Sequence, residues 1–300
     1  MAILRCLARR PNALQSLVAG VSRRTPTPSF TRNIYSVPTL NNHVDLQQNG
    51  IPGLLSPNGF NTAYTDYQQH MIDELNESTA GTAFENQDPK SLVIEFARDP
   101  TKAYAFNVAS MAFNNHFFFR GINTNPGVQS QPSEDLERQI NKDFSSRDTL
   151  RETFLATAEA MFGPGFVWLV QTNDTQFGSL RIVPTYLAGS PLSGAHYRRQ
   201  SHDLNTHNAE SYEELNKVGS FGRAAQQQPL GPKKPLGGVD VVPLMCVNTW
   251  EHAWLPDYGV KGKRAFLEAW WDRIDWDLVR QHATLISRQS QGQQKFLYEL

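Results

Sequence analysis

Apolar side chains recur every three or four residues in the first third of the chain. Over residues 58–76 this spacing places six of them on one face of a helix, namely Phe60, Tyr64, Tyr67, Met71, Ile72 and Leu75. A second run with helical spacing covers residues 90–120. Two long helices in succession favour an antiparallel hairpin, and the Asn, Pro and Gly residues of 123–127 end the pattern. The spacing therefore predicts a helical hairpin domain over residues 36–123.

The second half of the chain alternates between helical and strand patterns. Ser133 caps a helix, and a further helix has Leu150, Phe154, Leu155 and Ala158 on one face. Short runs of β-branched and aromatic residues bounded by turns are typical of strands. The predicted elements are helices over 133–144 and 147–161, strands over 166–170, 179–185 and 241–249, and helices over 261–272 and 275–290. We expect an α+β protein in which the hairpin is followed, over 133–300, by an α/β domain with a three-stranded antiparallel sheet.

A long polar insertion separates the second strand from the third. The segment 193–238 is rich in Gln, Asn, Ser, Gly and Pro, and loops of this length are functional or disordered. Three histidines, His196, His202 and His207, lie in it at irregular spacing and without a cysteine. This arrangement favours a solvated extension over a metal site.

The first 35 residues have the composition of a mitochondrial transit peptide. Six arginines are interspersed with Leu, Val, Ala and Ser, and no acidic residue precedes Asp45. The alternative is a basic arm that stays attached to the mature protein. Removal of residues 1–35 would leave 22 Lys and Arg against 29 Asp and Glu, a net charge of about −7. Such an acidic body repels phosphate, so any nucleic-acid contact requires a local basic patch.

The rest of the composition narrows the class further. No run of 18 apolar residues occurs, so we expect no membrane span. The two cysteines, Cys6 in the leader and Cys246 in the last predicted strand, do not form a disulfide framework, and Cys246 is expected to be a small buried apolar residue.

Two histidines lie in aromatic surroundings outside the insertion. His116 follows Asn115 and precedes three phenylalanines, and His252 lies between Trp250 and Trp254. A protein-bound redox metal needs three or four converging nitrogen or oxygen ligands. Either histidine alone is more simply a hydrogen-bonded core residue.

Taken together, four motifs resemble the iron/manganese superoxide dismutase family. They are Asn115-His116-Phe-Phe-Phe, the run from Gly163 to Val170, Trp250-Glu-His-Ala-Trp with Asp257-Tyr258, and Arg264 through Trp270-Trp271 to Asp275-Trp276. Their order and spacing match the family from about residue 54 to 285, apart from the insertion. The resemblance implies the helical hairpin and mixed α/β domain already predicted from the pattern.

The resemblance also implies a metal held by three histidines and one aspartate, and here two of the four positions are changed. His116 and His252 match their counterparts, whereas the first-helix histidine falls on Ala63 and the aspartate on Asn248. An alanine supplies no ligand, and a neutral amide does not offset the charge of a buried trivalent ion. The residues that surround the metal in the family are changed as well. Its active-site tyrosine falls on Met71, a neighbouring histidine on Tyr67, and the glutamine on Ala112 or Gly189. His70 is the alternative first-helix ligand, and Asn248 would still leave the set incomplete.

The leader, the incomplete metal site and the insertion together resemble the dismutase-like proteins of the fungal mitochondrial small ribosomal subunit. That resemblance implies a structural constituent without a cofactor, whose partners are small-subunit ribosomal proteins and a related dismutase-like chain in a heterodimer. It implies a partner interface at Glu251 and His252, with Leu255 in place of the family's interface tyrosine. The candidate rRNA contacts are Arg198, Arg199, Lys233 and Lys234 in the insertion. Two alternatives are a mitochondrial matrix iron/manganese superoxide dismutase and a free matrix homodimer that acts as a binding module.

Overall fold

The structure is a computed structural model of the chain, and it describes residues 35–85, 87–97, 99–125, 127, 130–172, 179–195 and 241–284. Residues 1–34 of the predicted transit peptide and residues 196–238 of the predicted insertion lie outside this set. The described residues all belong to one unit of the chain, Ile34–Leu300.

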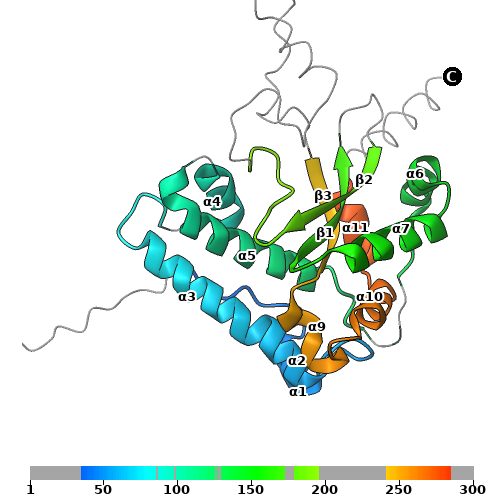
Figure 1. Ribbon diagram of the computed structural model, residues 1–300, viewed down its shortest axis with the longest axis horizontal. Helices are drawn as coiled ribbons and strands as arrows, with labels where there is room; N and C mark the ends of the chain where they lie inside the picture. Colours follow the sequence, from blue (N-terminus) through cyan, green and yellow to red (C-terminus); the bar gives the residue numbers. More distant parts are fainter. Residues whose placement is uncertain are drawn as a thin grey trace, which may run out of the picture. The chain divides into compact units, whose positions relative to one another are not determined.

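The helical half contains two long helical segments that pack side by side in opposite directions (Figure 1). Its elements are α1 (His43–Asn49), α2 (Pro57–Phe60), the π-helical turn η1 (Asn61–Asp66), α3 (Tyr67–Thr79), α4 (Pro89–Phe96), the 3-10 turn η2 (Pro100–Lys102) and α5 (Ala103–Arg120). Ser56 begins the first segment, since its hydroxyl accepts a hydrogen bond from the Gly59 amide at 3.0 Å. The apolar stripe predicted from the sequence is buried at Phe60, Tyr64, Ile72 and Leu75. This confirms the antiparallel hairpin.

The predicted single helix over 90–120 was wrong, because the structure divides it into α4, η2 and α5. Pro100 has no amide hydrogen to donate within a helix, so it is tolerated only in a first turn. Asp99 caps the new turn, and its Oδ1 accepts from the Thr101 amide at 3.0 Å. The break turns α4 aside from α5, and both helices bury apolar residues in a second, smaller core that includes Leu92, Phe96 and Val108.

The second half contains the predicted sheet and its covering helices. Its elements are α6 (Glu134–Phe144), α7 (Arg147–Ala160), β1 (Gly165–Thr172), β2 (Ser179–Tyr186), β3 (Val241–Asn248), α9 (Glu251–Tyr258), α10 (Lys263–Trp271) and α11 (Trp276–His282). The strands are antiparallel in the order β2-β1-β3, so Trp168 of the central strand pairs with Val183 on one side and Cys246 on the other. These elements confirm the α+β fold class.

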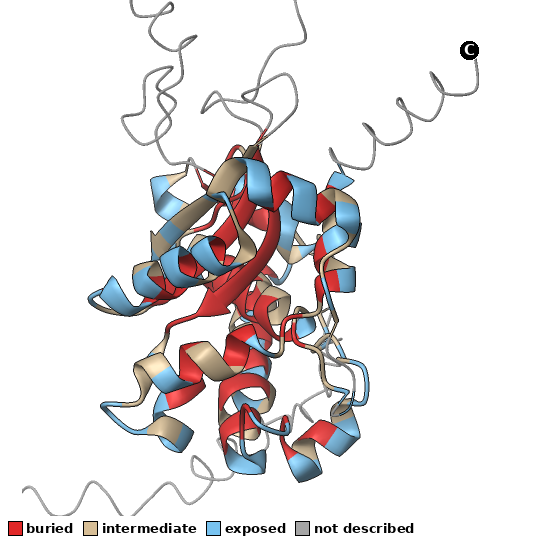
Figure 2. Cartoon of the chain, turned by 90° about the vertical axis from the view of Figure 1, so that its right-hand side faces the viewer, coloured by how far each residue is buried: buried red, intermediate tan, exposed pale blue. Residues whose placement is uncertain are grey.

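The main core lies on both faces of the sheet. Every residue of β1 and most of β3 are buried, and Figure 2 shows buried strands in red at the centre while the covering helices have pale-blue outer faces. Cys246 is buried, as expected. Phe154 of α7 is fully buried and stacks on Trp270 with ring centroids 5.4 Å apart. These aromatic contacts fix α7 and α10 against each other.

Two short helices were missed by the sequence analysis. They are α1, which follows Asn42 in the left-handed region at φ 58°, and α9, which contains Pro256. Each spans about two turns, too short to show a periodic pattern. In the described residues, no helix has both the length and the apolar character needed to cross a bilayer.

A matched pair of phenylalanine substitutions tests this account of the core. We expect Phe154→Ala to lower the free energy of unfolding by about 3–5 kcal/mol, because the cavity lies beneath stacked tryptophans. Phe162→Ala, at a side chain that is 97% exposed, should change it by no more than about 0.5 kcal/mol. Urea unfolding followed by tryptophan fluorescence measures both, and equal losses would contradict the assigned core.

Candidate functional site

The four positions suggested as metal ligands meet where the helical half contacts the sheet. Ala63 lies in η1, His116 in α5, Asn248 at the end of β3 and His252 in α9. Asn115, next to His116, is hydrogen-bonded to both Ala63 and Asn248, which brings the first and last of these elements together. We call this region the junction.

A chain of buried amide side chains fills the junction. The Nδ2 of Asn248 donates to the Oδ1 of Asn115 at 3.1 Å, and the Nδ2 of Asn115 donates to the Oε1 of Gln68 at 3.1 Å and to the carbonyl of Ala63 at 3.2 Å. The Nε2 of Gln68 then donates to the carbonyl of Ala112 at 2.9 Å. All three amide side chains are at most 1% exposed. We call Gln68, Asn115 and Asn248 the amide cluster.

The hydrogen bonds of the amide cluster run in one direction. The Oδ1 of Asn248 accepts from the Trp250 amide at 2.8 Å, so its Nδ2 is the atom turned to Asn115. An aspartate at this position would place a second acceptor against the Oδ1 of Asn115. Rotation of the Asn115 amide would then remove the donor from Ala63 and Gln68. The arrangement therefore requires an amide at residue 248.

His116 is held by Tyr64 beside the amide cluster. The Tyr64 hydroxyl donates to the carbonyl of Pro38 at 2.6 Å, and its oxygen lies 2.8 Å from Nδ1 of His116. A hydroxyl has one hydrogen, so His116 must be the donor in the second bond and carries its proton on Nδ1. Burial, together with the smaller effect of the Arg120 charge, lowers the pKa of His116 to about 4. His116 is therefore a neutral, hydrogen-bonded core residue.

His252 packs against an aromatic ring rather than against His116. Its imidazole stacks on Tyr67 with ring centroids 4.1 Å apart and an interplanar angle of 15°. Burial lowers its pKa to about 4. Its Nε2, like the Nε1 of neighbouring Trp250, is buried with no hydrogen-bond partner among the described residues.

The residues present at the junction do not fit an iron or manganese ion. Ala63 offers only a carbonyl that already accepts from Asn115, and Asn248 turns a hydrogen-bearing nitrogen inward. Two neutral imidazoles without an anionic ligand do not hold a redox metal. In the parts of the chain that the structure describes, no three His, Cys, Asp or Glu side chains are grouped so as to bind a metal ion. The alternative ligand His70 has a side chain that is 63% exposed and lies 3.9 Å from Glu74, on the surface.

An exposed face borders the junction at the start of α9. Glu251 is exposed, Leu255 is 37% exposed, and the turn that follows α7 presents Phe162. This turn is held to the segment before α9 and to α10, because Gly165 O accepts from the Thr249 amide at 2.9 Å and Met161 O accepts from Lys263 Nζ at 2.8 Å. Tyr186, the last residue of β2, and Leu187, which follows it, are also exposed beside the turn, where the Leu187 amide donates to Pro164 O. We call Phe162, Tyr186, Leu187, Glu251 and Leu255 the α9 face.

Sequence reasoning missed two residues of the junction. Gln68 carries no charge and matches no motif, and Asn115 was named only as part of the motif around His116, so the role of both in filling the site was missed. The available signal was a glutamine five residues after Ala63 and an asparagine directly before His116, on elements predicted to converge. The proposed rRNA contacts Arg198, Arg199, Lys233 and Lys234 lie outside the described residues.

Comparison with known proteins supports the resemblance drawn from the motifs. The family model for the C-terminal domain of iron/manganese superoxide dismutases matches residues 132–199 and 211–282. Small ribosomal subunit protein mS43 of Schizosaccharomyces pombe is 26% identical over 262 residues, covering 85% of this chain and 87% of that protein. Small ribosomal subunit protein mS42 of the same organism is 29% identical over 199 residues, covering 64% and 71%. The iron superoxide dismutase of a Nostoc species is 30% identical over 148 residues, covering 49% and 69%.

Restoring the carboxylate tests the amide cluster. We expect Asn248→Asp to lower the free energy of unfolding by about 3–5 kcal/mol at neutral pH, because it buries an unpaired charge opposite an acceptor. The buried carboxyl should have a raised pKa, so the loss is present above the ordinary aspartate pKa and shrinks as the pH falls and the group is protonated. Urea unfolding at neutral and acidic pH measures this. Asn141→Asp, on the exposed face of α6, is the control, and equal effects at the two positions would refute the requirement for an amide.

The two partly buried histidines, His116 and His252, predict a pH dependence of stability. Their folded pKa of about 4 lies below the ordinary value of 6.5, so the unfolded chain binds more protons between these values. Stability is fully present above about pH 6.5 and falls towards pH 4, by about 1.4 kcal/mol per pH unit for each histidine. His252→Gln should reduce this slope by one proton, while His70→Gln, at an exposed site, provides the control. Unfolding free energies measured between pH 4 and 6.5 test this prediction. If His252→Gln leaves the dependence of the unfolding free energy on pH unchanged, His252 does not have a lowered pKa in the folded protein.

Proposed function

The chain belongs to the iron/manganese superoxide dismutase family, and we propose that it is a structural constituent of the mitochondrial small ribosomal subunit rather than an enzyme. The observation that carries this proposal is the match along most of its length to a small ribosomal subunit protein. A second small ribosomal subunit protein matches over 64% of the chain. The arginine-rich leader without acidic residues supports a location in the mitochondrial matrix.

The chemistry of the junction supports a role without catalysis. A dismutase must hold a metal that alternates between two oxidation states, which requires ligands that offset its charge. Here the position of the anionic ligand is an amide, hydrogen-bonded at both ends. The amide cluster occupies the donors and acceptors of the junction with one another. We therefore propose that the chain has no metal cofactor and that its family fold is used as a scaffold.

The α9 face supports pairing with a related dismutase-like chain. Phe162, Tyr186 and Leu187 are large apolar side chains more than half exposed, and Leu255 adds to them. Grouped apolar side chains of this kind mark protein interfaces. Glu251 and His252 lie at the beginning of α9, beside these residues. In the family this pair reaches across the dimer, so we propose that the α9 face binds the partner chain.

Any contact with rRNA must overcome the acidic balance of the mature chain. After removal of residues 1–35 the net charge is about −7, which opposes binding to a polyanion. Arg198, Arg199, Lys233 and Lys234 all belong to the insertion and are the proposed rRNA contacts. We propose that most of the attachment to the subunit is through proteins.

Gradient sedimentation of mitochondrial extracts tests the proposed function. We expect the chain to travel with small ribosomal subunits at moderate salt and to be detected by mass spectrometry of the gradient-purified subunits. The isolated chain is expected to contain no stoichiometric iron or manganese and to show no dismutase activity. A chain that never sediments with the subunit is not a stable component of it, and a metal-loaded active chain would favour the enzyme reading.

A substitution in the α9 face serves as the internal control for this experiment. Phe162→Asp should abolish pairing and reduce the amount of chain that sediments with the subunit, because a charge replaces an apolar contact. Ile94→Asp, at a side chain of α4 that is 40% exposed and outside the α9 face, should sediment like the unaltered chain. Equal behaviour of the two variants would show that pairing does not use this face.

A further inference from the structure

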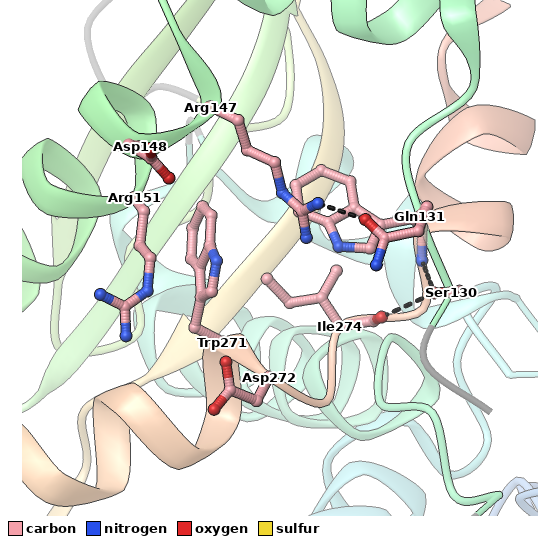
Figure 3. Close-up of a pocket in the computed structure, with 9 residues that line it drawn as sticks. Ser130, Gln131, Arg147, Asp148, Arg151, Trp271, Asp272 and Ile274 are labelled. Carbon is pink, nitrogen blue, oxygen red and sulfur yellow. Dashed lines mark hydrogen bonds between the residues drawn. The ribbon is translucent and has the colours of Figure 1, made fainter. Parts of the chain in front are cut away.

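A second site lies at the opposite end of α7 from the α9 face. A pocket of about 220 Å³ opens between the first turns of α7 and the link from α10 to α11 (Figure 3). Ile274 lies between the two sides, with Trp271 on one side and Gln131 on the other. Ser130 fixes the wall, since its hydroxyl donates to Ile274 O at 2.9 Å and accepts from the Trp276 amide at 2.7 Å. The pocket is therefore held in shape by bonds between distant segments.

The interior of the pocket presents hydrogen-bond donors. Trp271 is only 3% exposed, and its indole nitrogen faces the pocket without a hydrogen-bond partner among the described residues (Figure 3). The guanidinium of Arg147 is held over the ring of Trp276, 5.2 Å from its centroid, and donates to the Oε1 of Gln131. A guanidinium has five N–H groups, so one bond leaves most of them available to a ligand.

The acceptors of the inner wall are already used. Arg147 occupies the Oε1 of Gln131, and Ser130 occupies the carbonyl of Ile274. The two carboxylates that line the pocket, Asp148 and Asp272, belong to exposed residues and lie at its rim, where water solvates them. The fixed arginine and the indole N–H of Trp271 therefore offer donors to a ligand that brings its own acceptor.

The charges around the pocket favour a single carboxylate over a nucleic-acid backbone. Asp148 and Asp272 at the rim, with Glu152 bound to Arg151 nearby, would repel the successive phosphates of an RNA strand. A side-chain carboxylate enters alone, and a basic neighbour in the same peptide can pair with Asp272. We propose that this pocket binds an Asp or Glu side chain of a neighbouring protein, flanked by a Lys or Arg that meets the rim.

The test uses the full chain labelled with ¹⁵N-tryptophan and a defined probe. The six tryptophans give six indole signals, and Trp271→Phe identifies the one from the pocket. Titration with acetyl-Glu-Arg amide is expected to move the Trp271 indole signal in a saturable way, with a Kd on the order of 1–10 mM. Acetyl-Gln-Arg amide, which lacks the charge, and inorganic phosphate are the comparison ligands.

Variants separate the pocket from general effects of charge. Arg147→Gln should weaken binding of the Glu peptide about tenfold, whereas Arg138→Gln on the exposed part of α6 should leave it unchanged. Should Arg147→Gln unfold, Asp272→Asn replaces it. This variant is expected to weaken the binding of acetyl-Glu-Arg amide but not the binding of acetyl-Glu amide. Equal shifts with the Gln peptide, or no saturable shift, would overturn the proposal. Tighter binding of inorganic phosphate would overturn it in favour of a phosphate ligand.

Discussion

The buried amide cluster is the constraint on which the junction depends. Gln68, Asn115 and Asn248 join α3, α5 and β3 by hydrogen bonds between side chains that water does not reach. Neutral amides cost far less to bury than ions, provided that each donor and acceptor finds a partner. Here the bond from Asn248 orients the Asn115 amide so that it can donate to Gln68, and that bond orients Gln68 to donate to the carbonyl of Ala112. The same elements that would converge on a metal in an active family member are thus held by a neutral network.

The retained histidines follow from their packing partners. The Tyr64 hydroxyl donates to the carbonyl of Pro38, before α1, and accepts from His116. Through Tyr64, the imidazole of His116 therefore connects α5 to the segment before α1. His252 keeps its place through the stacked ring of Tyr67. Within the described part of the chain, the Nε2 of His252 and the Nε1 of Trp250 have no hydrogen-bond partner, and a buried donor or acceptor left in that state costs on the order of 1–3 kcal/mol.

Periodicity was sufficient for the elements that bury a regular face. The stripe from Phe60 to Leu75, the face of α7 around Phe154 and the three strands were all predicted, because each repeats its apolar positions over several turns or residues. Pro100 was a visible signal of a helix break, but the helical spacing on both sides of it led to the prediction of one continuous helix over residues 90–120. The two short helices α1 and α9 have no repeat long enough to detect.

The candidate site was also only partly predictable from the sequence. Residue identities were enough to predict that Ala63 and Asn248 do not act as the family's ligands. They could not show that Gln68 and Asn115 would fill the site, since that depends on the relative rotation of α3 and α5. The pocket beside Arg147 was equally invisible, because it joins segments more than a hundred residues apart through Ser130.

The helix α7 gives the two proposed contact sites a fixed separation. With 14 residues it spans about 21 Å from the pocket at Arg147 to the α9 face at Phe162. Its inner side is locked by the stack of Phe154 on Trp270, so neither end can move independently of the core. An acidic chain in an RNA-rich particle is held best through proteins, and two protein contacts at a fixed distance define both its position and its orientation. A rigid scaffold can therefore serve this role without any chemistry at the junction.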